Sequence, residues 1–230
     1  SYVPFHLGST FEGEQPSTIN DFFDLEKFPG KRGIHTWGNG IVEMALYASG
    51  VAIADIYDVL DTQEGQDMVF AKLDTIKDSV VFWSAGAKPL DLVNSGEVSM
   101  SIAYNGRIGG AVLNDGADYV TVWDGQVLEE EWLVLMNGAP NRAAAIHFLI
   151  HASSTASQAG QAHWINYAPM RPSALPIMAA GEPWFNTGAT IMEHMPTTDE
   201  HMKGGILANP DWWADNGQAT NDRYAAWMAK

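Results

Sequence analysis

The sequence predicts an α/β protein in which short strands alternate with amphipathic helices. Apolar residues follow helical spacing at residues 39–50 and again at 63–77. The segments VVFW at 80–83 and SMSIAY at 99–104 have the composition and spacing of buried or half-buried strands. Elements in this order fold into a sheet covered by helices, and 230 residues can bury a sizeable core in one large domain or in two lobes.

Local spacing and turn residues define the individual elements. In residues 39–50, Ile41, Ala45 and Leu46 share one helical face, and Gly50 is a suitable residue to end the helix. The C-terminal third is rich in proline and is expected to consist mainly of loops. The remaining predicted elements are a helix at 63–77, a strand at 80–83, a turn at 84–87, a short helix at 89–95, strands at 99–104, 117–123 and 132–136, a turn at 137–140, and helices at 142–152 and about 216–229.

Composition and charge limit the classes of function. Hydrophobic residues make up 46% of the chain and charged residues 17%, which is typical of an ordered globular protein. A formal charge of −16 repels nucleic acid and anionic lipid, and it serves either general solubility or the attraction of a cation. The chain has no cysteine, so neither disulfides nor thiolate chemistry is expected. No apolar run is long enough for a transmembrane helix.

Aromatic residues are frequent, and several follow the predicted strands. The chain contains nine tryptophans and seven tyrosines, among them Trp37, Tyr104, Tyr167 and Trp213. Ligand sites in α/β sheets lie beyond the carboxyl ends of strands, where aromatic rings can hold alkyl chains and cationic groups. The alternative is that these rings fill the core and its rim.

Four segments, taken in order, carry a resemblance to a known family. They are DFFDLEKFPGKRG at 21–33, GEVSMSIAYNGR at 96–107, EEEWLVLMNGAPNRAAAIHFLIHA at 129–152 and NPDWWADNGQATNDRYAAWMAK at 209–230. Together they resemble the extracellular solute-binding proteins of ABC importers, in the branch that contains the spermidine/putrescine-binding proteins. The resemblance extends over nearly the whole chain.

The resemblance implies a periplasmic-binding-protein-like (type II) fold of two lobes. Because similar proteins are longer at the N-terminus, most of the N-terminal lobe is expected to be missing from this sequence. Residues 1–128 would form the second lobe, and residues 129–178 would cross over and form part of the first. Residues 179–230 would return to the second lobe and end in the C-terminal helix.

The resemblance also implies a function without catalysis. A protein of this kind captures a small solute between its lobes and delivers it to an ABC permease in the membrane. We therefore expect a periplasmic or extracellular, membrane-associated monomer that is not an enzyme, needs no cofactor or metal and does not bind nucleic acid.

The resemblance suggests particular ligand-binding residues. Tyr104 stands at a strand end followed by Asn-Gly, where polyamine binders place a ring on the ligand. Glu131 keeps an acid of the crossover segment and Glu129 replaces its ring, whereas Trp37 and Gly40 replace two acids that hold one end of a diamine. The expected solute is therefore a small cationic or amine-bearing molecule, with a mono-cation preferred to a linear diamine. The complete expected set is Trp37, Ser84, Tyr104, Glu129, Glu131, Tyr167 and Trp213.

A metal-dependent hydrolase is the competing interpretation. His147 and His151 are four residues apart on a predicted helix, which is the spacing of a two-histidine metal clamp. Glu129 and Glu131 would supply carboxylates for acid–base chemistry. However, the sequence lacks the glutamate that follows the first histidine in the HExxH pattern.

Overall fold

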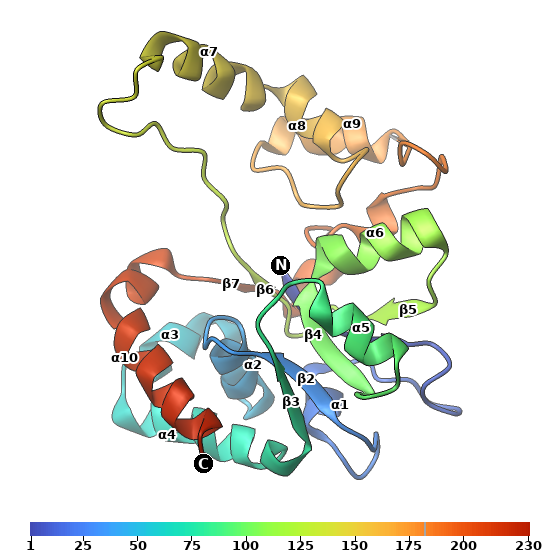
Figure 1. The fold of residues 1–230 in the computed structure, drawn as a ribbon, viewed down its shortest axis with the longest axis vertical. Helices are drawn as coiled ribbons and strands as arrows, with labels where there is room; N and C mark the ends of the chain where they lie inside the picture. Colours follow the sequence, from blue (N-terminus) through green and yellow to red (C-terminus); the bar gives the residue numbers. More distant parts are fainter. Residues whose placement is uncertain (182) are drawn as a thin grey trace.

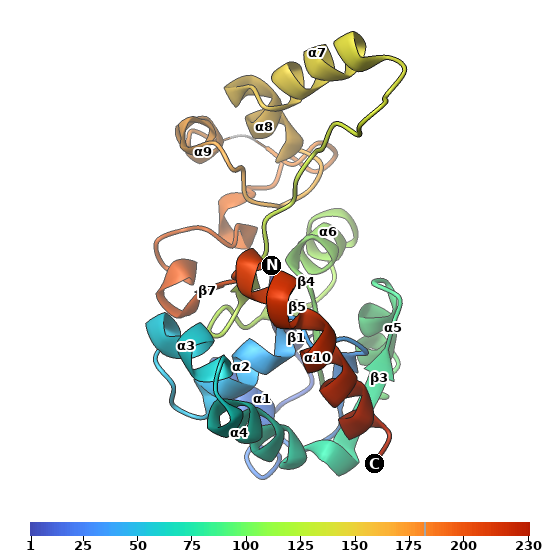
Figure 2. The ribbon, with the colours of Figure 1, turned by 90° about the vertical axis from the view of Figure 1, so that its left-hand side faces the viewer.

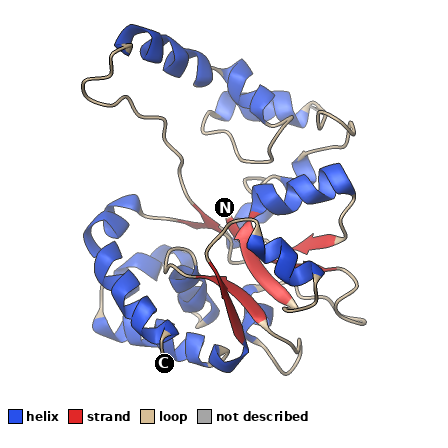
Figure 3. Ribbon diagram, viewed as in Figure 1, coloured by secondary structure: helices blue, strands red, loops and turns tan. Residues whose placement is uncertain are grey.

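The computed structural model describes residues 1–181 and 183–230, and its centre is a seven-stranded mixed sheet (Figures 1 and 3). The strand order is β3-β2-β4-β1-β6-β7, and β5 pairs with the second half of β1 on the side opposite to β4, which is also the side of β6. Strands β2, β3 and β4 are parallel to one another, while β1 runs antiparallel to β4. The strands are β1 (Tyr2–Leu7), β2 (Arg32–His35), β3 (Val80–Trp83), β4 (Met100–Tyr104), β5 (Tyr119–Thr121), β6 (Val127–Leu128) and β7 (Ile206–Leu207).

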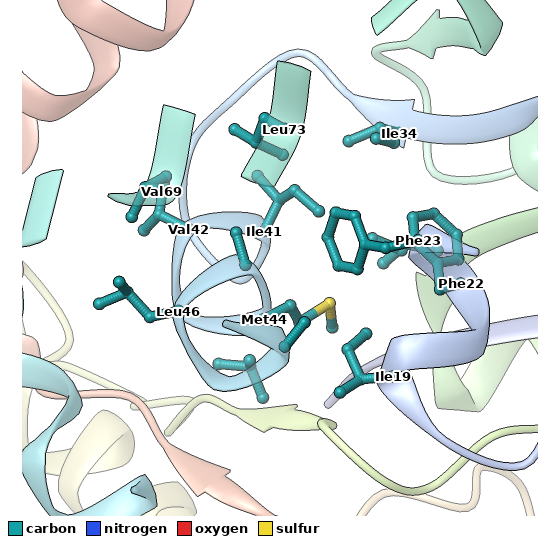
Figure 4. Packing of buried hydrophobic residues seen from close by; sticks show 14 of the residues in the cluster. Ile19, Phe22, Phe23, Ile34, Ile41, Val42, Met44, Leu46, Val69 and Leu73 are labelled. Atoms are coloured by element: carbon teal, nitrogen blue, oxygen red, sulfur yellow. The ribbon is translucent and has the colours of Figure 1, made fainter. Parts of the chain in front are cut away.

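Helices cover both faces of this sheet, as the α/β prediction requires. Successive strand residues point to opposite faces, so Ile102 of β4 joins one core cluster and Ala103 joins the other. The larger cluster packs under five helices, and in Figure 4 Ile41 and Met44 face Phe23. These helices are α1 (Ile19–Phe23), α2 (Ile41–Ala48), α3 (Ile56–Leu60), α4 (Gln63–Asp74) and α10 (Pro210–Met228), while α5 (Lys88–Asn94) and α6 (Asn105–Asp115) cover the opposite face.

A helical region extends away from the sheet. Residues 129–141 form a long extended connection that leads to α7 (Arg142–Ala152), α8 (Thr155–Gln161) and α9 (Leu175–Ala179) (Figures 1 and 2). Its buried residues form a third cluster, which includes Leu113 of α6 and therefore joins this region to the sheet body. None of the helices in the described ranges combines the length and the apolar composition needed to cross a bilayer. Short 3-10 helices lie at Ile53–Asp55, Lys77–Ser79, Pro172–Ala174, Met192–His194 and His201–Gly204.

The predicted strand at 132–136 is wrong. The structure has no strand between residues 129 and 141, and the side chains of Trp132 and Val134 are 64% and 70% exposed. A strand needs a neighbouring backbone for its hydrogen bonds, and none lies beside this segment. The composition of the segment favours a strand, but the described chain offers it no partner.

Other element boundaries also differ from the prediction. The C-terminal helix begins at Pro210 because the Asn209 side chain caps it, accepting from the backbone N–H groups of Asp211 and Trp212 at 3.1 Å each. The strand predicted at 117–123 is limited to β5, and helix α6 was not predicted. The other predicted helices and strands are present, with shifts of a few residues at their ends.

A buried arginine holds the Pro-Gly segment at 21–33. Arg32 is fully buried, and its guanidinium donates to the carbonyl oxygens of Phe22 at 2.7 Å, Gly30 at 2.8 Å, Phe28 at 2.6 Å and Asp24 at 3.3 Å. Burial lowers the pKa of Arg32 to about 10, so the group stays charged at neutral pH. The segment that carries part of the family resemblance is therefore a structural support for the start of β2.

Replacing Arg32 with methionine should lower the free energy of unfolding by about 3 kcal/mol, because several carbonyl oxygens lose their donors. Urea unfolding measures this change, and the exposed neighbour provides the matched control Lys31→Met. A loss of less than about 1 kcal/mol would show that water replaces the guanidinium without cost.

Candidate functional site

Several strands end at one edge of the sheet and bring chemically useful side chains together there. Since β2, β3 and β4 are parallel, their last residues His35, Trp83 and Tyr104 lie along the same edge. The antiparallel β1 begins at this edge, where Tyr2 stands opposite Tyr104. Strand β6 also ends at this edge, and Glu129 is the residue that follows it. Ligand sites of α/β sheets are found beyond such an edge.

An aromatic cluster of Tyr2, His35, Trp37, Trp83 and Tyr104 forms this edge. The ring centroids of Tyr2 and Tyr104 are 4.5 Å apart, and the rings of His35 and Trp37 stack at 4.5 Å with an interplanar angle of 5°. Trp83 meets the Trp37 ring edge-on at 5.3 Å. Tyr2, His35 and Trp83 are buried, whereas Trp37 and Tyr104 are half-buried and form the accessible side of the cluster.

The polar atoms of the cluster are linked by hydrogen bonds. The Trp37 indole N–H donates to the Tyr2 hydroxyl at 3.1 Å, and the Tyr2 and Tyr104 hydroxyl oxygens are 2.6 Å apart. Burial raises the pKa of both tyrosines, so both hydroxyls keep their protons at neutral pH. Burial lowers the pKa of His35 to about 3, and its neutral ring lies 2.6 Å from the Trp37 carbonyl through Nδ1. The cluster itself therefore carries no charge at neutral pH.

Negative charge is supplied by the segment that leaves β6. Glu129 is half-buried and Glu131 is exposed, and the charges of both act on Tyr104 and raise its pKa. Burial raises the pKa of Glu129, and the charge of Glu131 adds to this shift. Glu130 is exposed and accepts a hydrogen bond from the Trp132 indole at 3.2 Å. Alternate residues of this acidic run thus act on the aromatic cluster.

Helix α6 adds a positive charge that is not among the ligand-binding residues expected from the sequence. Arg107 lies in the first turn of α6, and its side chain is exposed. A Cβ atom placed on Gly86 would lie 3.8 Å from Arg107 Nε and 3.9 Å from Tyr104 Cδ2, so the turn that follows Ser84 borders both residues. In residues 1–181 and 183–230, no hydrogen bond or ion pair engages this guanidinium. In the sequence, Arg107 stands three residues after Tyr104, which ends a predicted strand. That spacing is the feature from which Arg107 could have been predicted to lie at the site.

Tyr167 joins the same group of residues from the helical region. A Cβ atom on Gly106 would come within 2.5 Å of Tyr167 Cε1, so the ring packs against the first turn of α6. The side chain of Asn105 donates to the carbonyl of Asn166 at 2.7 Å and ties the two segments together. Burial raises the pKa of Tyr167, while the charge of Arg107 lowers it. The helical region therefore contacts the sheet body next to Arg107.

The indole N–H of Trp213 is bonded to a protein side chain and is not free to bind a ligand. Its indole N–H donates at 2.7 Å to Glu43, which also accepts from the Tyr57 hydroxyl at 2.9 Å and from the Gly40 backbone N–H at 2.8 Å. Glu43 is fully buried, and burial raises its pKa. The Trp213 ring lies near Gly38, with its Cη2 atom 3.6 Å from the position of a Cβ there. Trp213 thus borders the residues next to Trp37, but its polar atom is already bonded.

The alternative of a metal-dependent hydrolase finds no support. His147 and His151 lie on the exposed helix α7, at the far end of the extended connection that begins with Glu129 and Glu131 (Figure 1). Within the described residues, no group of three or more His, Asp or Glu side chains could hold a metal ion.

Comparison with known proteins defines the family. The model of the bacterial extracellular solute-binding proteins matches residues 7–193. The chain belongs to this family. It is 34% identical to the gamma-aminobutyric acid (GABA)-binding protein of Pseudomonas aeruginosa over 222 aligned residues, and this alignment covers 96% of the chain. The chain spans 60% of the length of that curated relative.

Solved structures agree with this assignment. The Atu4243-GABA receptor shares 30% identity with a TM-score of 0.81, and the match covers 100% of this chain and 67% of the receptor. A spermidine/putrescine ABC transporter substrate-binding protein from Streptococcus pneumoniae is 12% identical with a TM-score of 0.69, over 99% of this chain and 67% of its own, and it supports the fold alone. The resemblance to ABC solute-binding proteins and the type II periplasmic-binding-protein fold are thus confirmed. The family is described as bacterial extracellular solute-binding proteins, and these relatives are named for the solutes or substrates that they bind.

Proposed function

We propose that this chain is the solute-binding component of an ABC importer and that its ligand is a small amino acid with separated charges, such as GABA. One observation carries the proposal: an acidic pair, Glu129 and Glu131, and a cation, Arg107, flank the same aromatic cluster. Opposite charges beside one apolar surface suit a ligand that has an ammonium group at one end and a carboxylate at the other. The two relatives named for GABA support the same ligand class.

The ammonium group would bind at the acidic side of the cluster. Glu129 is half-buried, so a charge pair there is stronger than at an exposed site. The faces of Tyr104 and Trp37 can add cation–π attraction of about 1–2 kcal/mol when the contact is desolvated. The site offers one half-buried carboxylate, that of Glu129, for one cationic group. It therefore fits a ligand with a single positive charge better than a linear diamine.

The carboxylate would bind at the Arg107 side. A guanidinium presents parallel N–H donors that match a carboxylate, and the Tyr104 ring and the turn after Ser84 border the same space. A polyamine has no negative group to place there and would meet a repulsive charge. Arg107 therefore favours an amino acid over spermidine.

We also propose two lobes that close on the ligand by a hinge. Residues 1–128, with the C-terminal part of the chain, would form one lobe, and residues 129–178 would cross into the other. The third core cluster still includes Trp184, Ile191 and Met195, so we place the return to the sheet body after Met195 and not at residue 179. Such a monomer would act in the periplasm or outside the cell and would deliver its solute to a membrane permease.

Calorimetry on the complete natural protein tests this function. GABA should bind at least about ten-fold more tightly than putrescine or spermidine, which equals about 1.4 kcal/mol. Replacing Arg107 with glutamine should weaken GABA binding by about 30-fold or more, since the ligand's carboxylate loses its cationic partner. The same change should leave putrescine binding unchanged or improve it.

The control for this variant is Arg142→Gln, which removes an exposed arginine from α7. Tighter binding of spermidine than of every mono-cationic solute would contradict the proposed ligand class. An Arg107→Gln variant that binds GABA as well as the unmodified protein would contradict the assigned carboxylate site.

A further inference from the structure

The C-terminal helix α10 holds the short loop that carries Trp37 from β2 to α2. Before Trp37, the Tyr224 hydroxyl donates to the carbonyl oxygen of His35 at 2.9 Å. After Trp37, the side-chain oxygen of Asn221 accepts from the backbone N–H of Gly38 at 2.7 Å. Residues three apart lie on the same side of a helix, so one side of α10 fixes the backbone on both sides of Trp37.

The partners of Asn221 fix the orientation of its amide group. Its nitrogen donates to the carbonyl oxygen of Gly217 at 2.9 Å, and a carbonyl can only accept, so the oxygen is the atom that faces the loop. The contact is also close. A Cβ atom on Gly38 would lie 3.3 Å from Asn221 Oδ1 and 3.6 Å from Trp213 Cη2. Gly38 is buried, so its N–H depends on this acceptor rather than on bulk water.

The ring of Trp37 can meet a ligand with one face. The other face stacks on the His35 ring at 4.5 Å with an interplanar angle of 5°, and the indole N–H donates to the Tyr2 hydroxyl at 3.1 Å. Cation–π attraction requires the cation to lie over the ring, within about 6 Å of its centroid. The position of the backbone that carries Trp37 therefore decides how well the open face can attract an ammonium group.

We propose that Asn221 is a positioning residue for ligand binding: by holding the Gly38 N–H, it keeps the open face of Trp37 where the ligand's ammonium group binds. The inference rests on the proposed function, in which that face contributes to binding. It gives α10 an effect on the site that needs no contact with the ligand. Trp213 of the same helix has its indole N–H bonded to Glu43, whereas Asn221 acts through the backbone of the loop.

Asn221 can be replaced without opening the core, because it is half-buried, whereas Tyr224 is fully buried. Asn221→Leu keeps the approximate size and removes the acceptor, and GABA affinity, measured by calorimetry on the complete natural protein, should fall about five-fold. Asn221→Asp keeps an oxygen for the Gly38 N–H and should restore the affinity to within about two-fold of the unmodified protein. The matched control is Asn216→Leu on the same helix, which likewise removes a side-chain bond to a helix carbonyl, that of Trp212 at 3.2 Å. It should leave the affinity unchanged.

A double-mutant cycle separates positioning from a general structural effect. Trp37→Leu should weaken GABA binding about ten-fold, because the cation–π contact is lost. Adding Asn221→Leu to that variant should change the affinity less than about two-fold, since Asn221 acts through Trp37.

A second measurement reports the hydrogen bond without any ligand. Exchange of the Gly38 amide hydrogen, followed by NMR on the ligand-free complete protein, should be at least about ten-fold faster in Asn221→Leu than in the unmodified protein. Asn221→Asp and Asn216→Leu should keep the slow exchange.

The outcomes distinguish positioning from the function. Faster Gly38 exchange with unchanged GABA affinity, or equal losses of affinity from Asn221→Leu in both backgrounds, overturns the positioning role and leaves the amino-acid site in place. A loss in Asn221→Asp as large as in Asn221→Leu overturns it as well. If the unmodified protein binds no GABA or related amino acid, the proposed function fails and the positioning role fails with it. A loss that needs Trp37 and is restored by aspartate supports the proposal.

Discussion

Replacing Glu129 with glutamine is expected to weaken GABA binding by about a hundred-fold, which equals about 2.7 kcal/mol. The substitution keeps the shape of the side chain and removes its charge. The effect is large because Glu129 is half-buried beside Tyr2 and Tyr104, where an ammonium group would lose its water and find no other buried carboxylate that is accessible to it. Calorimetry on the complete natural protein measures the change.

The neighbouring residue gives a matched control for this prediction. Glu130→Gln makes the same chemical change in the same segment, but Glu130 is exposed and bonded to Trp132. It should alter GABA affinity less than two-fold, since exposed charges contribute little. Equal effects at the two positions would show that only the general negative field attracts the ligand.

Glu129 also gives the site a pH dependence with a definite sign. Burial raises the pKa of Glu129 above the ordinary value of 4.5. An ammonium group binds the ionised carboxylate, so affinity is complete well above the raised pKa and falls as the pH drops through it. The decline should therefore begin at a higher pH than an exposed glutamate would give. This part of the pH profile should vanish in the Glu129→Gln variant, and an unchanged profile would assign the dependence to another group.

The sequence predicts the sheet edge well because the information is local. Strand composition at 80–83 and 99–104 and the turns that follow place Trp83 and Tyr104 at strand ends, where they are observed. Glu129 and Glu131, which the family resemblance suggests as ligand-binding residues, are two positions apart, and both charges act on Tyr104. These features depend on residues that are close together in the chain.

Features that depend on distant partners are less accessible from the sequence. Residues 132–136 have the composition of a strand, but a strand forms only beside another backbone, and none is present in the described chain. Arg107 shares the site only because α6 starts at the end of β4, and a helix was not expected there. The bond between Trp213 and Glu43 joins residues 170 positions apart, which no local pattern reveals.

That last bond leads to the largest expected effect on stability. Replacing Glu43 with alanine should lower the free energy of unfolding by about 3–5 kcal/mol. The Trp213 indole, the Tyr57 hydroxyl and the Gly40 N–H all lose their acceptor, and each unsatisfied buried donor costs about 1–3 kcal/mol. Since these donors belong to α10, to α3 and to the start of α2, the loss should spread over the whole helical face of the sheet.

Urea unfolding followed by circular dichroism measures this change, and Glu64→Ala on the exposed side of α4 is the matched control. The pH dependence is a second test. Burial raises the pKa of Glu43 above 4.5, so its contribution to stability is complete below the unfolded value and is lost as the pH rises through the folded value. The difference between the unmodified protein and Glu43→Ala should therefore be larger near pH 4.5 than at neutral pH. A loss below about 1 kcal/mol at both pH values would mean that water satisfies the three donors and that Glu43 does not hold α10 against α2.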